Sequence, residues 1–199
     1  MRASSLAVAY YLVASVAWAA ALEVGRRGDP LVSVGVAGAA LAVAAFWRFH
    51  GAPLFMTTPR ALLLGATGGA VLVAGTYLVF PLVAQAPAIR WGTADLYAQI
   101  GAFSALRALA LAAVVVAEEL AWRGPALDAL PGSPRARLAV GTLAYAAAHV
   151  AFGGWLLAGV ALLCGLAWGG LRLGTRGVVA PIVCHLAWDL SIMVLRPLG

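Results

Sequence analysis

Long apolar stretches follow one another along the chain, interrupted only by short segments rich in proline, glycine and arginine. Hydrophobic residues make up 64% of the sequence and charged residues 10%, which leaves too few polar side chains to cover a water-soluble globule. A soluble enzyme is therefore excluded. We predict an all-α fold, a polytopic transmembrane helical bundle of about seven spans of about 30 Å each. The predicted spans are residues 5–24, 30–47, 61–85, 99–123, 136–153, 155–172 and 177–195.

The segments between these stretches define the expected boundaries. Residues 87–95 are expected to connect the third and fourth spans, Gly153-Gly154 to separate the fifth from the sixth, and Pro125 to kink or break the chain after the fourth. We expect one integrated membrane domain, in which residues 1–97 are N-terminal helices without a specific motif and residues 98–199 form the functional core. The first stretch could alternatively be a signal peptide.

All 13 basic residues are arginine, which, with the abundant alanine, glycine and valine, favours a bacterial source and a bacterial cytoplasmic membrane. The net charge of +6 does not indicate nucleic acid, because the arginines are scattered in short loops.

With seven spans, eight arginines fall on the side of the N-terminus and four on the other, which predicts a cytoplasmic N-terminus. Arg107 is left out of this count, since it either snorkels or marks an interfacial segment before a shorter span. The eight are Arg2, Arg48, Arg60, Arg123, Arg135, Arg137, Arg172 and Arg176.

Several other residues are expected to be structural. Cys164 and Cys184 lie in apolar runs without a spacing typical of a metal site or a disulfide. His50 lies in a loop and is expected at the membrane surface, apart from any functional site. Tryptophans near the ends of spans are expected to anchor the protein at the interface. They are Trp47, Trp91, Trp122 and Trp155.

Ionisable residues inside the apolar stretches are the strongest functional signal. Each costs about 2.5 to 3.5 kcal/mol at membrane depth, so such groups are normally retained for catalysis, ion transfer or a specific pairing. They are Glu118, Glu119, Arg123, His149, His185 and Asp189. Counted from the hairpin at Gly132, Glu118 and His149 lie at depths of about 21 and 26 Å. The two side chains are therefore expected to meet inside the bilayer.

Helical geometry gives the two glutamates different roles. Glu118 and Glu119 point about 100° apart, and Arg123 follows Glu119 by four residues, the favourable order for an ion pair within a helix. Arg123 is therefore expected to hold Glu119, which leaves Glu118 as the freer carboxylate. A carboxylate and an imidazole that share one water molecule form a general-base unit, so Glu118 and His149 are candidates for catalysis.

His185 and Asp189 are four residues apart, share one helical face and are expected to stabilise an oxyanion on the opposite side of a bound amide. The cluster thus fits hydrolysis of a peptide bond without a cofactor. Zinc bound by Glu118, His149 and His185 is the mechanistic alternative, although the chain lacks the His-Glu-x-x-His helix of zincins. Outside proteolysis, an ion- or proton-coupled transporter and a non-catalytic membrane scaffold or immunity protein remain open.

The order of these motifs resembles that of the CPBP family of intramembrane proteases, also called the type II CAAX prenyl endopeptidase or Abi family. The resemblance covers about residues 115–190. It implies a glutamate-dependent endopeptidase that acts on a membrane-anchored protein or peptide near its C-terminus, in CAAX-like, bacteriocin-related or sorting-signal processing. The matching motifs are Glu118-Glu119-x-x-x-Arg123, Tyr145-x-x-x-His149 and His185-x-x-x-Asp189.

The resemblance also implies a role for each motif residue. Glu118 would activate the water with help from His149, while His185 and Asp189 would lie on the oxyanion side. Glu119, Arg123 and Tyr145 would be orienting or structural. Two residues depart from the family pattern. Tyr145 stands where phenylalanine is common, and Asp189 stands where asparagine is common, so it cannot donate a hydrogen bond unless protonated.

Overall fold

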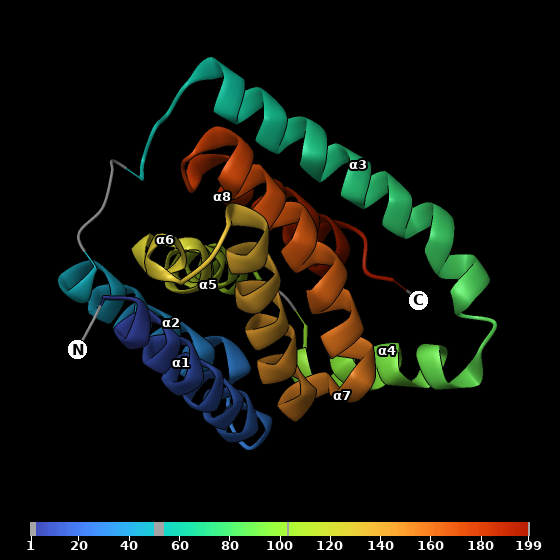
Figure 1. Ribbon diagram of the computed structural model, residues 1–199. Coiled ribbons are helices and arrows are strands. Elements are labelled where there is room, and N and C mark those ends of the chain that lie inside the picture. Colours follow the sequence, from blue (N-terminus) through green and yellow to red (C-terminus); the bar gives the residue numbers. More distant parts are fainter. Residues whose placement is uncertain (1–2, 50–53, 103, 199) are drawn as a thin grey trace.

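The computed structural model describes residues 3–49, 54–102 and 104–198, and within these ranges every regular element is a helix. His50 lies outside the described residues. The predicted all-α fold is confirmed. The elements are α1 (Ala3–Arg26), α2 (Pro30–Arg48), α3 (Pro59–Val83), α4 (Pro87–Ile100), α5 (Ala105–Arg123), α6 (Pro125–Ala129), α7 (Pro134–Thr175), α8 (Val179–Asp189) and the π-helix η1 (Leu190–Leu195) (Figure 1).

Side-chain caps determine where several helices begin. Asp29, Thr58 and Ser133 each accept a hydrogen bond from a backbone N–H in the first turn of α2, α3 and α7. A proline follows each of these caps, because its missing N–H would have no helical partner in the first turn. Ser104 caps α5 in the same way, without a proline. The starts of α2, α3 and α7 therefore lie within two residues of the predicted positions.

Helix α7 is a hairpin of two helical halves. Its 42 residues would extend about 63 Å if straight, roughly twice the apolar thickness of a bilayer. The helix is interrupted at Gly153 and Gly154, whose backbone angles are not helical, and Gly154 has a φ of 59°. Gly165 packs beside Thr142, and these two residues are equally distant from the break in sequence. The chain therefore folds back on itself there, as Figure 1 shows, and the predicted separation of the fifth and sixth stretches is confirmed.

Four of the described helices are long and apolar enough to cross a membrane, namely α1, α2, α3 and α7. If α4 and the segment formed by α5 and α6 are counted together as one bent span, the number of candidate spans rises to five. Residues 179–195, in α8 and η1, form a shorter apolar helix. When the two halves of α7 are taken separately, the apolar helices correspond to the seven predicted stretches.

The segment before α5 differs from the prediction, in which residues 87–95 connect two spans. Residues 87–95 do not form a loop but most of α4, which begins with Pro87. The chain then bends by 108° before α5. Gly101 lies at this bend with a φ of 75°, a value that glycine adopts far more readily than other residues. The predicted stretch 99–123 is therefore not one straight span, and Arg107 lies in the first turn of α5.

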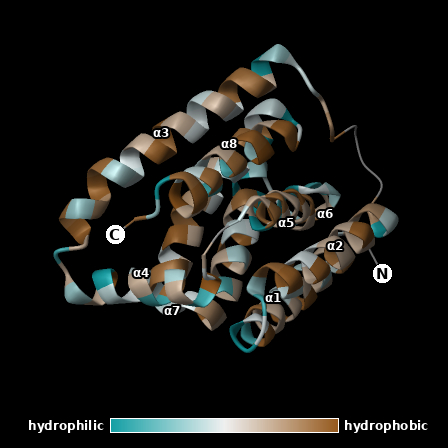
Figure 2. Ribbon diagram, turned by 180° about the vertical axis from the view of Figure 1, so that it is seen from behind, coloured by the Kyte–Doolittle hydropathy of each residue, from teal (hydrophilic) through white to brown (hydrophobic). Residues whose placement is uncertain are grey.

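Helix α5 lies at the centre of the bundle, where it contacts α2 on one side and α7 and α8 on the other, and α3 crosses the outside of α8 (Figure 1). Many large apolar side chains of the long helices are exposed, and Figure 2 shows that hydrophobic residues run along the ribbons of these helices. Val16, Val36 and Leu63, for example, are each more than 60% exposed. An apolar outer surface is what a helical bundle in contact with lipid requires.

Some residues assigned to the membrane surface from the sequence are buried. The prediction that Trp122 anchors at the interface is wrong, because Trp122 is 1% exposed, whereas Trp47 and Trp155 are 81% and 84% exposed. Arg123 and Arg172 are each 3% exposed. Both were counted among the arginines that orient the chain, yet both contact protein groups. The cytoplasmic N-terminus stays a prediction, now based on the other arginines.

Glycine lets α3 approach α8 closely. A Cβ atom at Gly65 would lie 2.6 Å from the carbonyl oxygen of Ala180 and 2.9 Å from Cβ of Val183. Both distances are shorter than van der Waals contact, so α8 leaves no room for a side chain at this position. Small residues serve the same purpose between other membrane helices.

We expect Gly65→Val to lower the melting temperature of the protein in detergent, because overpacking of this kind costs about 1–3 kcal/mol. Gly75→Val is the matched control, since Gly75 lies on the same helix and a Cβ there would meet no atom within 4 Å. Scanning fluorimetry measures both variants. Equal melting temperatures would contradict the close packing of α3 on α8.

Candidate active site

Glu119 is the most enclosed member of the ionisable cluster, with no exposed side-chain surface. Its Oε1 atom lies 3.0 Å from Nη1 of Arg123 and 2.8 Å from Nδ1 of His185. The expected pair of Glu119 with Arg123 is therefore confirmed, and the contact with His185 connects α5 to α8. Buried charges are costly unless they are paired and hydrogen-bonded. This ion cluster therefore restricts how α5 and α8 can be placed.

Glu118 points to α7 instead. Its Oε1 atom lies 3.6 Å from Nε2 of His149, so the predicted meeting of these two residues is confirmed. His149 Nδ1 lies 2.8 Å from the carbonyl oxygen of Tyr145, and a carbonyl can only accept, so Nδ1 carries a hydrogen and donates. In the neutral ring, Nε2 then presents its lone pair toward Glu118. The 3.6 Å separation is too long for a hydrogen bond, and Glu118 Oε1 has no hydrogen-bond partner among the described residues.

His185 stands between two carboxylates. Its Nδ1 faces Glu119, and its Nε2 lies 3.5 Å from Oδ2 of Asp189. Both carboxylates accept hydrogen bonds, so an imidazolium with two N–H groups satisfies both of them. Trp168 stacks on the same ring, with centroids 3.5 Å apart and planes at 18°. The face of an indole stabilises a cation placed over it.

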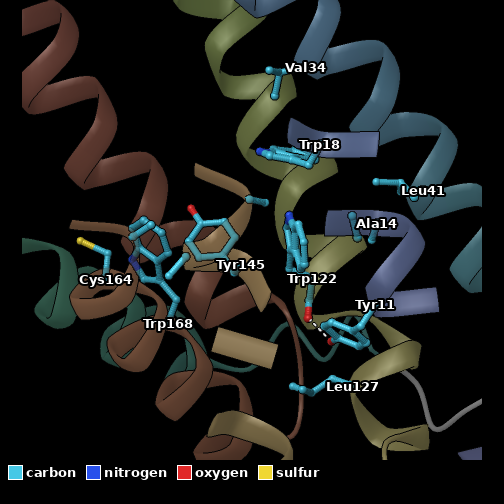
Figure 3. Close-up of a cluster of buried hydrophobic side chains, with 14 of the residues drawn as sticks. Tyr11, Ala14, Trp18, Val34, Leu41, Trp122, Leu127, Tyr145, Cys164 and Trp168 are labelled. Atoms are coloured by element: carbon cyan, nitrogen blue, oxygen red, sulfur yellow. Dashed lines mark hydrogen bonds between the residues drawn. The ribbon is translucent and has the colours of Figure 1, made fainter. Parts of the chain in front are cut away.

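Aromatic rings enclose the guanidinium of Arg123. Its Cζ atom lies 4.2 Å from the ring centroid of Tyr145 and 5.4 Å from that of Trp168. Figure 3 shows Tyr145 between Trp122, which comes from α5, and Trp168. The hydroxyl of Tyr145 also interacts with the carboxylate of Glu118. Tyr145 thus contacts the cluster through both its ring and its hydroxyl.

The ionisable side chains differ in how much of their surface is exposed. Three side chains keep a small exposed part, 8% for Glu118, 10% for His149 and 12% for Asp189. The other three are more closely covered, with 0% for Glu119, 4% for Arg123 and 3% for His185. The first three therefore keep the most exposed surface in the cluster, although the Oε1 atom of Glu118 itself is buried. The other three are more deeply enclosed.

The distribution of charge singles out Glu118. Glu119 has Arg123 and His185 as cationic partners, and Asp189 has His185. In the described part of the chain, the only basic side chain within 4.0 Å of Glu118 is the imidazole of His149. Glu118 is thus the carboxylate of the cluster that is not tied to an arginine or an imidazolium. It is the best placed to take up a proton and return it.

The donors of the alternative zinc site do not converge on one point. Both nitrogens of His185 face carboxylates, and Nδ1 of His149 faces a carbonyl. Over residues 3–49, 54–102 and 104–198, no group of three or more His, Cys, Asp or Glu side chains is arranged to hold a metal. As it stands, the geometry of Glu118, His149 and His185 does not fit a zinc ligand set.

Two residues near the cluster were missed from the sequence. Trp168 stacks on His185, but no pattern distinguishes it from the other tryptophans. Arg172 donates from Nε to the carbonyl oxygen of Arg123 and pairs through Nη2 with Asp128 at 2.5 Å. Its position inside an apolar stretch was available as a signal, since ionisable residues within membrane helices usually pair with one another or with backbone carbonyls.

Residues 100–191 match the family model described as type II CAAX prenyl endopeptidase Rce1-like. No curated protein and no solved structure matches the chain. The matched segment contains all three motifs, from Glu118 to Asp189, which meet in space in the structure. The resemblance seen in the sequence is confirmed. Over residues 100–191, the chain is similar to the CPBP family of CAAX-type membrane endopeptidases.

Proposed function

We propose that the protein hydrolyses a peptide bond with a water molecule activated by Glu118 and His149. The observation that carries this proposal is the 3.6 Å separation between Glu118 Oε1 and His149 Nε2. Both atoms are acceptors when the glutamate is ionised and the histidine keeps its hydrogen on Nδ1. One water molecule can then donate a hydrogen to each of them and turn a lone pair toward a substrate carbonyl.

The reaction balances with the groups at this site. The water oxygen bonds to the carbonyl carbon, Glu118 takes up the proton, and the carbonyl oxygen becomes an oxyanion. When the tetrahedral intermediate collapses, the carbon–nitrogen bond breaks and Glu118 returns the proton to the leaving amine. The products are a carboxylic acid and an amine, and His149 orients the water throughout.

We assign His185 and Asp189 to the oxyanion side. The contact of 3.5 Å between His185 Nε2 and Asp189 is loose compared with the 2.8 Å contact between Nδ1 and Glu119. An oxyanion can therefore replace Asp189 as the acceptor of the Nε2 hydrogen while Nδ1 keeps the ring in place. Asp189 itself donates only when it is protonated. Glu119 and Arg123 act as orienting residues behind His185.

The proposed substrate is a membrane-anchored protein or peptide that is cut near its C-terminus. CAAX-like, bacteriocin-related and sorting-signal peptides all belong to this class. We propose that the reaction takes place in a bacterial cytoplasmic membrane and requires no metal. This proposal is supported by the family, by the apolar outer surface of the bundle and by the burial of the cluster among its helices.

We expect Glu118→Gln and His149→Ala each to lower the cleavage rate by about 10²- to 10⁴-fold, the usual contribution of a general base. The assay is release of a fluorescent fragment from a membrane-anchored reporter by the purified protein in detergent. Glu23→Gln is the control, because the side chain of Glu23 is 50% exposed on α1. Full activity of both site variants would refute the catalytic assignment. Ion flux in liposomes that is lost in Glu118→Gln, without any cleavage, would favour the transporter.

We expect cleavage to persist after treatment with EDTA or 1,10-phenanthroline, because the proposed water is activated by a carboxylate and an imidazole. The reporter assay is run before and after dialysis against each chelator. Loss of activity that added zinc restores would show that Glu118, His149 and His185 rearrange to bind a metal.

We expect Arg123→Ala to destabilise the protein by about 3–5 kcal/mol, since it leaves the carboxylate of Glu119 buried with one cationic partner fewer. Glu118→Gln should change the unfolding free energy little, because it keeps the shape of the side chain and removes a charge that has no arginine beside it. Denaturation in detergent measures both variants. Similar losses of stability would argue against separate roles for Glu118 and Glu119.

A further inference from the structure

The end of helix α5 has an unusual set of hydrogen-bond partners. The helix ends at Arg123, Gly124 is extended, and Pro125 begins α6. In a continuous helix the carbonyl of Ala121 would accept from the N–H of residue 125, but proline has none. The carbonyls of Trp122 and Arg123 also lose their helical donors where the chain turns. Three consecutive carbonyls inside the bundle therefore need other donors.

Side chains from distant parts of the chain supply these donors. The hydroxyl of Tyr10 lies 2.9 Å from the Ala121 carbonyl oxygen, and that of Tyr11 lies 2.5 Å from the Trp122 carbonyl oxygen. Nε of Arg172 lies 2.9 Å from the Arg123 carbonyl oxygen. Figure 3 shows the bond of Tyr11 to the carbonyl of Trp122. Each of the three carbonyls thus has a side-chain donor, two from α1 and one from the second half of α7. The Tyr10 hydroxyl lies between two carbonyls, because it is also 3.0 Å from the carbonyl oxygen of Leu41.

The peptide groups of α5 connect two of these hydrogen bonds to the backbone of Glu118 and Glu119. The peptide unit that contains the Ala121 carbonyl also contains the Trp122 N–H, which in the helix bonds to the carbonyl of Glu118. The next peptide unit connects Tyr11 in the same way to the carbonyl of Glu119. A donor at one end of such a chain polarises and holds the peptide groups along it. The two tyrosines are therefore each one peptide unit away from the backbone of a glutamate.

The surroundings explain why such donors are needed. Helix ends inside a membrane protein have little water to satisfy their carbonyls, and an unsatisfied buried group costs free energy. Tyr11 is 3% exposed and Arg172 is 3% exposed, so both donors are protected from water. Without them, the last turn of α5 would have to unwind or shift to find partners. That turn carries Glu119 and Arg123.

We propose that Tyr10, Tyr11 and Arg172 are positioning residues that hold the broken end of α5, and with it Glu118 and Glu119, in the geometry for water activation. This inference rests on the proposed function of Glu118. Tyr10 and Tyr11 lie outside the segment that matches the family model. The N-terminal half of the chain, which carries no motif, thus supports the active site directly.

Tyr10→Phe and Tyr11→Phe test the proposal, because each removes one hydroxyl and keeps the ring. We expect kcat for the reporter to fall about tenfold in each variant, since small misplacements of catalytic groups are costly. KM should stay within about twofold, because neither hydroxyl is placed at the substrate. Deuterium exchange of peptides that cover residues 115–127 should become faster. Tyr77→Phe is the matched control, because its hydroxyl also lies between two carbonyls, those of Ser191 and Arg196.

The outcomes separate this inference from the proposed function. Unchanged kcat in Tyr10→Phe and Tyr11→Phe, together with an inactive Glu118→Gln, would overturn the positioning role and leave the function standing. An equal loss of kcat in Tyr77→Phe at the same melting temperature would also overturn it. Full activity of Glu118→Gln would instead overturn the function on which the inference rests.

Discussion

The arrangement of the site depends on the pairing of the Glu119 carboxylate with Arg123 and His185. Such buried ion clusters are a weak source of stability, because desolvation of the charges offsets much of their attraction. Their geometric effect is stronger. A carboxylate that must face a guanidinium on α5 and an imidazole on α8 allows few relative positions of the two helices. Once Glu119 is held in this way, the helix directs Glu118 to the neighbouring face, where His149 lies.

Breaks in the helices bring the polar groups together. The break at Gly153 and Gly154 folds α7 back, so that Tyr145 in its first half lies near Trp168 in its second half. The break at Gly124 ends α5 within one turn of Glu119. Irregular backbone is tolerated at membrane depth only where protein groups satisfy it. The positions of the breaks are therefore connected to the side chains that supply hydrogen bonds there.

Much of the fold was predictable from the sequence, because apolar runs and proline–glycine punctuation are local signals. The meeting of Glu118 with His149 and the pair of Glu119 with Arg123 were also predictable, since both follow from helical spacing and depth. The contact between Glu119 and His185 was not, because it depends on the rotation and tilt of α8 relative to α5. Arg172 was misread as a loop charge for a similar reason. Its partners, on α5 and α6, are 44 or more residues away in sequence.

The two adjacent glutamates show how environment separates chemically identical groups. Glu119 is neutralised by two cationic partners and is closed to water, so it suits a fixed structural role. Glu118 has a neutral acceptor opposite it and a small exposed surface, which suits a group that exchanges protons. Asp189, where the family commonly has asparagine, adds a second anion beside His185. Two carboxylates around one imidazole attract a cation, so the acid at this position fits the charged ring that we propose as the oxyanion donor.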